Sequence, residues 1–423
     1  MPQQESRRKA VQAVLEEVFR RHGFLPIDTP VLEYTDVLLG KGGGETDKQI
    51  YRFEDNGGRD VAMRFDLTVP FARYMAQHRA ELYLPFKRFH IAKVFRGENT
   101  QRGRYREFTQ CDFDIVGVDC ASADFEILLL MVRALEALGI DDFHVHLSHR
   151  GIFNRFLASL GAGDRSAEVL RTVDKIKKVG AEAVRAELHD LLDSERADSI
   201  LSYITADAAG GSAREVLARL VELAGSDESD TGRLDAVLRA VEEVGIIAKV
   251  RLDPSITRGL DYYTGIVYET FLDRAVEIGS VCSGGRYNDL ASIYTKEHIP
   301  GVGSSIGLDR LLAALEELEE GQPVPSAVDV LVLNFDEQDV GYYHALAERF
   351  RAAGFTSEVY PEARKLGAQF SFAEKKGIPA GVICGPEERV AGTVTVKDLT
   401  SRTNHAGLSL EEAVDVVRGI LAR

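Results

Sequence analysis

The chain has 423 residues, of which 45% are hydrophobic and 28% charged, and its formal net charge is −16. This length exceeds what one hydrophobic core usually supports, so we expect two or three domains in an ordinary globular protein. The acidic balance excludes a protein that binds nucleic acid through its overall charge, because such a partner would have to be held by local basic patches.

The chain begins with a helical pattern. Apolar residues recur with helical spacing over residues 5–22, and Gly23 stops the pattern. Further on, the segment MRFDLTVPFARY (63–74) places Asp66 and Thr68 on one face of a predicted strand. Taken alone, Asp66 could instead cap a helix formed by VPFARY. The sequence leaves these two alternatives open.

Two alternating segments, PFKRFHIAKVFR and YREFTQCDFDIVG, predict an antiparallel hairpin with a long loop between its strands. Side chains alternate across a strand. One face of the second strand therefore carries the side chains of Phe108, Gln110, Asp112 and Asp114. Residues 122–139 then predict a helix with a serine cap and a glycine stop.

The loop of this hairpin, RGENTQRGRYR, carries four arginines: Arg96, Arg102, Arg104 and Arg106. Arg96 ends the first strand, and Arg104 and Arg106 begin the second, where a guanidinium can reach a ligand lying on the sheet. Arginine is suited to bidentate contact with phosphate, so the loop predicts a polyphosphate site. The alternative is a loop whose charges only keep it solvated.

Residues 161–245 have a different character. They are rich in helical patterns, nearly free of aromatic residues, and carry eighteen acidic against eleven basic residues. We interpret them as an inserted helical module. Strand patterns return at 248–252, 262–271 and 278–283.

The segment SITRGLDYYTGIVYET contains an arginine before a turn and two adjacent tyrosines. Neighbouring side chains in a strand point to opposite faces, so we do not expect both Tyr262 and Tyr263 to be core residues. Gly259 and Gly265 permit close approach of the backbone, and Arg258 precedes the turn. The pattern favours a functional site over the alternative, a hairpin with core tyrosines.

The last third of the chain carries three further signals. VCSGGRYNDL predicts a strand that ends in a glycine pair, after which Arg286 and Tyr287 open a helix. GVGSSIGLDRLLAALEEL predicts a strand of small residues against which a flat ligand could lie, with Arg310 meeting its charge. EEGQPVPSA (319–327) is a linker by composition, and the alternating strand and helix patterns after it indicate a separate small α/β domain.

The cysteines and the hydropathy of the chain indicate the cellular compartment in which we expect the protein. The four cysteines form no CxxC pair, which favours free thiols over disulfides or a zinc site. No uncharged apolar run approaches the roughly 20 residues of a membrane span, and the amino terminus lacks the apolar region of a signal peptide. We expect a cytoplasmic protein.

Taken in order, these segments resemble a known family. FRGENTQRGRYREF and PGVGSSIGLDRLL resemble motifs 2 and 3 of class II aminoacyl-tRNA synthetases, and RGLDYYT and SGGRY resemble the two histidine signatures of the histidyl-tRNA synthetase family. The first helix with strand 27–33 looks like the dimer-forming motif 1. FDLTVPFARY and GRYREFTQCDFDI look most like the eukaryote-like branch, since Asp66 and Asp114 stand where many bacterial members have glutamate.

The resemblance implies an architecture and an activity. Residues 1–318 would form an α+β catalytic domain, an antiparallel sheet flanked by helices, with the helical insertion at about 161–245. The linker 319–327 would lead to an α/β anticodon-binding domain at 328–423. Such a protein is a homodimer that joins histidine to tRNA(His) with ATP, and its Mg²⁺ is bound mainly with the ATP phosphates rather than by protein side chains.

The resemblance also implies an ATP site that consists of Arg96, Glu98, Arg104, Phe108 and Arg310. Arg96 and Arg258 would be catalytic, holding the α-phosphate from two sides. Arg104 and Arg310 would hold the outer phosphates, Glu98 the adenine amino group, and Phe108 would stack on the adenine ring. The turn at Arg102 would meet the tRNA acceptor end, while Arg106 has no assigned ligand.

The implied histidine site consists of Asp66, Thr68, Gln110, Asp114, Arg258, Tyr262, Tyr263 and Tyr287. The amino group of histidine would contact Asp66, Thr68 and Gln110. Asp114 and Tyr263 would satisfy the two nitrogens of the imidazole ring. Tyr262 and Tyr287 would close the walls of the pocket.

Two other classes of protein compete with this interpretation. A catalytically silent relative, such as the regulatory subunit of ATP phosphoribosyltransferase, resembles the catalytic core but typically lacks the anticodon domain and has degraded histidine signatures. A pure RNA-binding or interaction protein would not need the pair Arg96 and Arg258. The intact signatures and the carboxy-terminal domain favour the enzyme.

Overall fold

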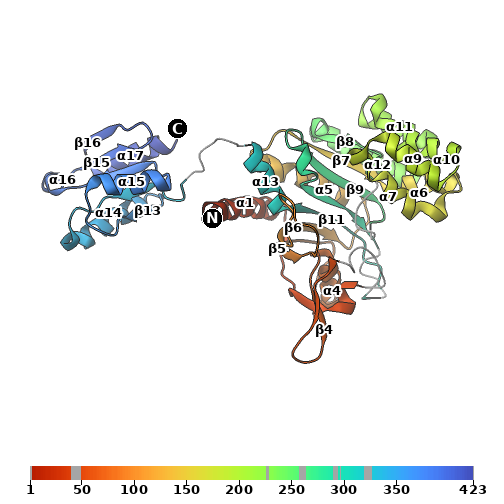
Figure 1. Cartoon of the computed structure of the whole chain (residues 1–423), viewed down its shortest axis with the longest axis horizontal. Coiled ribbons are helices and arrows are strands. Elements are labelled where there is room, and N and C mark those ends of the chain that lie inside the picture. Colours follow the sequence, from red (N-terminus) through yellow and green to blue (C-terminus); the bar gives the residue numbers. More distant parts are fainter. Residues whose placement is uncertain are drawn as a thin grey trace. The chain divides into compact units, whose positions relative to one another are not determined.

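The computed structural model describes residues 2–39, 49–224, 228–256, 263–288, 294–295, 297–318 and 326–422 (Figure 1). The chain divides into two compact units, Ala10–Glu320 and Gly321–Arg423, the second grouped with Met1–Lys9. Each unit is described by itself. Within the described ranges, no helix is both long enough and apolar enough to cross a membrane.

An eight-stranded sheet forms the centre of the larger unit, in the order β1-β5-β6-β11-β10-β9-β7-β8. Its strands are β1 (Leu25–Pro26), β5 (Phe86–Phe95), β6 (Glu107–Val116), β7 (Phe143–His149), β8 (Val250–Leu252), β9 (Ile266–Leu272), β10 (Cys282–Tyr287) and β11 (Gly301–Gly307). The inner pairs are antiparallel, as predicted, while β1 pairs with β5 and β8 with β7 in parallel. The sheet is therefore mixed rather than purely antiparallel.

The predicted hairpin is confirmed as β5 and β6, which pair over their whole length. Odd-numbered residues of β6, such as Cys111 and Phe113, face a core built with helices α1 (Pro2–Arg21), α5 (Ala121–Ala137) and α13 (Leu308–Leu318). Even-numbered residues face the opposite side, where α4 (Thr68–His78) packs Phe71 against Phe86 and Val116. The face carrying Asp112 and Asp114 is thus the one that is not used for the main core.

A smaller antiparallel sheet, in the order β2-β4-β3, follows the first helix. It consists of β2 (Leu32–Tyr34), β3 (Arg52–Glu54) and β4 (Asp60–Met63), with the short helix α2 (Thr35–Leu39) beside it. Most of the glycine-rich segment between α2 and β3 lies outside the described residues.

A group of helices lies between β7 and β8 in the chain, over the region predicted as a helical module, and is drawn in yellow to green in Figure 1. The group comprises α6 (Arg150–Ser159), α7 (Ser166–Val173), α8 (Ile176–Val179), α9 (Ala181–Leu191), α10 (Ser194–Ile204), α11 (Ala213–Ala224) and α12 (Glu228–Glu243). Its core includes Phe153, Phe156 and Tyr203, whose rings pack on one another. The helices therefore form a packed module rather than a solvated extension.

The carboxy-terminal unit has a five-stranded sheet in the order β13-β12-β14-β15-β16. Its strands are β12 (Val330–Val332), β13 (Ser357–Val359), β14 (Ala380–Ile383), β15 (Val394–Asp398) and β16 (Asn404–Leu408), and its helices are α14 (Val340–Ala352), α15 (Leu366–Lys376), α16 (Pro386–Ala391) and α17 (Leu410–Leu421). The alternating pattern predicted this α/β arrangement. β16, α16 and α17 were not predicted individually.

Four local predictions were wrong or displaced. Helix α5 is capped by Cys120, not by Ser122, although Gly139 has the positive φ of +73° expected of a helix stop. Arg286 and Tyr287 lie inside strand β10 rather than opening a helix, because the glycine pair before them pairs with both neighbouring strands. The strands predicted at 248–252, 262–271 and 278–283 begin two to four residues later.

The fourth of these predictions concerns Asp66. It lies between β4 and α4, so the prediction that it shares a strand face with Thr68 was wrong. Its Oδ1 accepts hydrogen bonds from the backbone N–H of Thr68 (3.1 Å) and Val69 (2.9 Å). These are donors of the first helical turn, so Asp66 takes the role of a cap, as the alternative interpretation had it, but from the position before the N-cap residue Leu67.

Candidate active site

Two buried carboxylates of β6 share one buried arginine. Asp112 and Asp114 are each 2% exposed, and Arg88 on the neighbouring strand is 0% exposed. Arg88 Nη2 lies 2.7 Å from Asp114 Oδ2 and 3.9 Å from Asp112 Oδ2, and its guanidinium lies 4.2 Å from the Phe71 ring centroid. The sequence interpretation missed Arg88. Its signal was the hairpin register, which places it directly opposite Asp114.

A third carboxylate joins this cluster from the start of α4. The capping residue Asp66 is buried, and the Thr68 hydroxyl beside it lies 3.5 Å from Asp112 Oδ2. The site therefore brings together Asp66, Thr68 and Asp114, three of the predicted histidine contacts, around Asp112, which was on the predicted face but was not assigned a role. We call Asp66, Asp112 and Asp114 the carboxylate cluster.

Two tyrosines border the carboxylate cluster. Tyr287 of β10 donates its hydroxyl hydrogen bond to Asp114 Oδ1. Burial raises the pKa of Tyr263 above its usual range, and the nearby Asp114, Asp112 and Asp66 raise it further, which places this hydroxyl in the field of the cluster. Tyr263 and Tyr287 thus lie beside the other residues of the predicted histidine site. Tyr262 and Arg258 lie outside the described residues.

The small-residue strand β11 makes room for these side chains. An added Cβ at Gly303 would overlap the Asp114 carboxylate, and one at Gly301 would overlap the Tyr287 ring. Gln110 lies on the same face of β6, and its Nε2 donates to Ser305 of β11 over 3.0 Å. The small residues of this strand were predicted to make room for a ligand. In the structure, Gly301 and Gly303 make room for the side chains of Tyr287 and Asp114.

The carboxylate cluster pairs three carboxyl groups with one buried arginine, Arg88. Burial raises the pKa of all three carboxyl groups, and the nearby charge of Arg88 opposes this shift. The pKa of Asp112 rises to about 7, because the charge of Asp114 adds to the effect of burial. Among the described residues, the buried Gln110 Oε1 beside the cluster accepts no hydrogen bond. Buried acceptors are usually paired, so the site suits a small cation that carries N–H donors.

The raised pKa of Asp112 predicts a specific dependence of stability on pH. The pKa of this carboxyl group rises from 3.8 to about 7 on folding. Between these two pH values the folded state keeps the proton that the unfolded state has lost, so the protein loses stability as the pH rises from about 4 to about 7. At about 1.36 kcal/mol per pKa unit, the loss has an upper limit of roughly 4 kcal/mol.

Asp112→Asn cannot ionise and should escape this loss. We therefore expect the melting temperature of the variant minus that of the wild type to increase from about pH 5 to about pH 7.5, as measured by differential scanning calorimetry without ligand. A difference that stays constant or falls over this range would contradict the assignment of a raised pKa to Asp112.

A second cluster, of arginines, lies at the other end of β6. The guanidinium of Arg96 lies 4.3 Å from the Phe65 ring centroid and 5.0 Å from that of Phe108, and its Nε donates to the Phe65 carbonyl over 3.1 Å. Arg104 lies 3.7 Å from the Glu98 carboxylate. The predicted residues Arg96, Phe108, Glu98 and Arg104 thus lie at the ends of β5 and β6 and in the loop between them.

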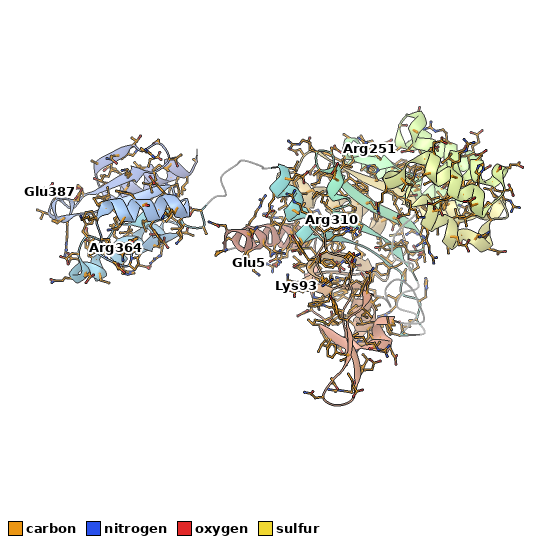
Figure 2. The ribbon with its side chains drawn as sticks, viewed as in Figure 1. Glu5, Lys93, Arg251, Arg310, Arg364 and Glu387 are labelled. Carbon is orange, nitrogen blue, oxygen red and sulfur yellow. The ribbon has the colours of Figure 1, made fainter. Side chains whose placement is uncertain are left out.

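Arg310 joins this group from α13 (Figure 2). Burial, together with the charges of Arg104 and Arg96, lowers the pKa of Arg310 to about 10, so the three arginines act on one another electrostatically. The preceding Asp309 is buried and accepts the backbone N–H of Thr109 over 2.7 Å, which fixes the start of α13 to β6. Three converging arginines suit a ligand with several negative charges.

The turn of the arginine loop packs on α13. Gly103 has a φ of +72°, and an added Cβ would lie 3.2 Å from Arg310 Cα, so this position requires glycine for both conformation and space. Arg102 forms an exposed ion pair with Glu317 of α13 at 3.1 Å. Arg106, which had no predicted ligand, donates to the carbonyl of Glu98 over 3.4 Å.

One face of β6 connects the two clusters, with Phe108 beside Arg96 at one end and Asp112 and Asp114 towards the other. Phe108, Gln110, Asp112 and Asp114 follow one another on the even-numbered face of β6. Six residues of extended chain span roughly 20 Å, so an anionic ligand at the arginines and a cationic ligand at the carboxylates can meet between them. Within the described ranges, no group of three or more His, Cys, Asp or Glu side chains is arranged to hold a metal ion.

Comparisons with known proteins match both units. The family model described as histidyl-tRNA synthetase matches residues 1–311, and the model described as anticodon binding domain matches residues 328–420. The chain belongs to the histidyl-tRNA synthetase family. It is similar to the histidine–tRNA ligase of Treponema denticola, with 49% identity over 99% of this chain and 96% of the relative, and to that of Rhodopirellula baltica, with 46% identity over 97% and 93%.

Solved structures agree with this membership. The histidyl-tRNA synthetase of Nostoc sp. PCC 7120 superposes with a TM-score of 0.88 and 31% identity, covering 100% of this chain and 97% of that one. A Bacillus halodurans protein described as an ATP phosphoribosyltransferase regulatory subunit/histidyl-tRNA synthetase has a TM-score of 0.72 at 22% identity, over 86% of this chain and 92% of that one, and shows only a shared fold. The named sequence relatives are bacterial, so they give no support to the predicted eukaryote-like branch.

Proposed function

We propose that this chain is a histidine–tRNA ligase that forms histidyl-adenylate and pyrophosphate from histidine and ATP and then transfers histidine to the 3′ end of tRNA(His). The proposal is carried by the positions of the two clusters: the buried carboxylates lie towards one end of β6, and Arg96, which contacts the Phe108 ring, lies with Arg104 at the other end. An amino acid with two charged or polar nitrogen groups fits the first cluster, and a polyphosphate fits the second.

Histidine would enter the carboxylate cluster with its cationic ammonium group and its imidazole ring. Its ammonium group would contact Asp66, Thr68 and Gln110, whose Oε1 atom is a buried acceptor without a partner among the described residues. Asp114 would accept a hydrogen bond from the imidazole ring, and Tyr263 would contact its other nitrogen. An amino acid without these nitrogens would lose its hydrogen bonds to Asp114 and Tyr263 in a buried site, so the site would discriminate by about 10⁴-fold or more without editing.

ATP would lie along the arginine cluster. Phe108 would stack on adenine and Glu98 would accept its amino group, while Arg104 and Arg310 would hold the outer phosphates. Arg96 would hold the α-phosphate, with Arg258, which lies outside the described residues, on the other side.

The reaction makes one bond and breaks one at the α-phosphorus. A histidine carboxylate oxygen attacks the phosphorus, and the bond to the bridging oxygen breaks, so that pyrophosphate leaves with the electron pair. Such a step needs positioning and neutralisation of charge more than proton transfer. Arg96 supplies both. Mg²⁺ would arrive with the ATP phosphates, whose oxygens are its preferred ligands.

Transfer to tRNA predicts a separate role for Arg102. The side chain of this arginine is 58% exposed, and its ion pair with Glu317 lies at the surface, where such pairs contribute little, so it is available to the acceptor end of tRNA. We expect Arg102→Ala to leave histidine-dependent ATP–pyrophosphate exchange within about twofold of the wild type and to raise the KM for tRNA(His) roughly 3–10-fold, through one lost phosphate contact. Measuring both reactions on one preparation checks this, and an equal loss in both would contradict it.

We place the interface of the proposed homodimer on the small sheet β2-β4-β3. Tyr34 of β2 and Phe53 of β3 both pair with Val61, so they share one face, and they are 54% and 44% exposed. Leu32, two residues before Tyr34, extends this apolar face and is 48% exposed. An exposed apolar patch of this kind marks an interaction surface, and we propose that a second copy of the chain covers it.

Charges on this face should separate the copies. We expect the double variant Tyr34→Glu/Phe53→Glu to run as a monomer in size-exclusion chromatography with light scattering, because a like-charged face disfavours self-association. The matched control is Val276→Glu, which adds a charge at another exposed apolar residue of the larger unit and should leave a dimer. A dimeric double variant, or a monomeric wild type, would contradict the proposal.

The architecture and compartment complete the proposal. The catalytic domain would span 1–318 with its helical insertion at about 161–245, and the anticodon-binding domain 328–423, joined by the linker 319–327 in the cytoplasm. Aminoacylation tests the function directly: the pure protein should attach labelled histidine to tRNA(His). Stimulation of an ATP phosphoribosyltransferase without any aminoacylation would favour the regulatory alternative.

A further inference from the structure

Beside the histidine site lies a second ionic cluster that the proposed reaction does not use. It centres on Arg286, which is 2% exposed and neighbours Tyr287 in β10, so that the two side chains leave the strand on opposite faces. Arg286 Nε donates to Asp124 Oδ1 over 2.8 Å, and its Nη1 lies 3.2 Å from Asp119 Oδ1. These contacts anchor β10 to the start of α5.

The same two carboxylates are held from the helical module. Arg233, in α12, donates from Nε to Asp124 Oδ2 over 2.6 Å, and its Nη1 lies 2.5 Å from Asp119 Oδ1. Asp124 is 0% exposed, and each of its oxygens is paired with a different arginine. One buried carboxylate therefore joins an arginine of the helical module to an arginine of β10. Removing one partner of such a buried pair is costly, since the remaining charges stay desolvated.

The backbone around Arg286 lines the histidine site. Its carbonyl accepts the N–H of Thr264 over 2.7 Å, next to Tyr263. Gly285, on its other side, approaches Tyr263 so closely that an added Cβ would lie 3.0 Å from the ring. Tyr287 donates to Asp114. A shift of Arg286 would therefore displace the side chains that we assign to the imidazole ring.

We propose that Arg233 is a positioning residue for the histidine site: through Asp124 and Arg286, it ties the helical module to the strand that places Tyr287 against Asp114. The inference rests on the proposed function, because the ligand affected is histidine. The cluster joins β10, whereas the ATP residues lie in the β5–β6 loop and at the start of α13. Arg233 therefore acts on the binding of histidine rather than on that of ATP.

The test compares substrates within one assay. In histidine-dependent ATP–pyrophosphate exchange by the full chain, Arg233→Met should raise the KM for histidine about tenfold and leave the KM for ATP within about twofold. Arg233→Lys, which keeps the charge but not the fork of donors, should give an intermediate KM for histidine. A general loss of folding would change both KM values or the amount of active enzyme, not the KM for histidine alone.

A matched control lies in the same module. Arg214 of α11 pairs with Asp235 of α12 at 2.8 Å without reaching Asp124, and Arg214→Met should keep both KM values of the wild type. The inference is overturned if Arg233→Met leaves the KM for histidine within twofold, raises both KM values together, or is matched by Arg214→Met. A wild type without histidine-dependent exchange would overturn the proposed function, and this inference with it.

Discussion

Replacing Arg96 with alanine is expected to slow histidyl-adenylate formation about 10²–10³-fold, through loss of charge stabilisation in the transition state. Arg96 is held between the rings of Phe65 and Phe108, and its Nε is fixed to the Phe65 carbonyl. A guanidinium that is already oriented needs no reorganisation when charge develops on the α-phosphate. Single-turnover formation of histidyl-adenylate, measured at saturating histidine and ATP, gives the rate directly.

Two further variants serve as comparisons for Arg96→Ala. Arg96→Lys keeps a positive charge but loses the fork, so we expect an intermediate loss. Arg102→Ala removes an arginine from the same loop, where it pairs with Glu317 at the surface, and should form the adenylate at nearly the normal rate. An Arg96→Ala enzyme with a rate within threefold of the wild type would show that Arg96 does not act on the reacting phosphate.

Replacing Asp114 with asparagine is expected to raise the KM for histidine about 100-fold, because a charge-assisted hydrogen bond in a buried site is lost and an unsuitable donor takes its place. Asparagine has nearly the same volume, so the neighbouring Gly303 remains compatible with it. The KM for ATP should stay within about twofold, because the arginine cluster lies at the other end of β6. Histidine-dependent exchange measured over both substrates separates the two constants.

The same variant tests which group recognises the imidazole ring. Arg88 and Tyr287 both contact Asp114, so the melting temperature must be measured beside the KM values. If Asp114→Asn keeps the wild-type KM for histidine, then Asp114 is a structural partner of Arg88 and not a contact of the substrate.

Much of the site could be predicted because its residues follow a simple period. The alternation along β6 placed Phe108, Gln110, Asp112 and Asp114 on one face, and the structure agrees. The position of Asp66 could not be decided in this way, since a carboxylate before a proline-containing segment suits a strand end as well as a helix cap. The backbone hydrogen bonds to Thr68 and Val69 decide it.

Residues that act through partners distant in the sequence were harder to find. In the sequence Arg88 is one alternating residue of β5, and only the register of the hairpin places it opposite Asp114, where its guanidinium also lies near Asp112. Arg286 was expected to open a helix, because a glycine pair usually interrupts a strand. In the structure those glycines permit close packing of β10 between β9 and β11, and Arg286 reaches Asp124, which is 162 residues away in the chain.

The central claim is that the carboxylate cluster and the arginine cluster, at opposite ends of β6, bind histidine and ATP for one reaction. ATP–pyrophosphate exchange by the pure full chain, run with each of the twenty amino acids in turn and without tRNA, tests it most directly. The account predicts exchange that depends on histidine and is lost in Arg96→Ala. Exchange that is absent with histidine, or that proceeds equally with other amino acids, would contradict it.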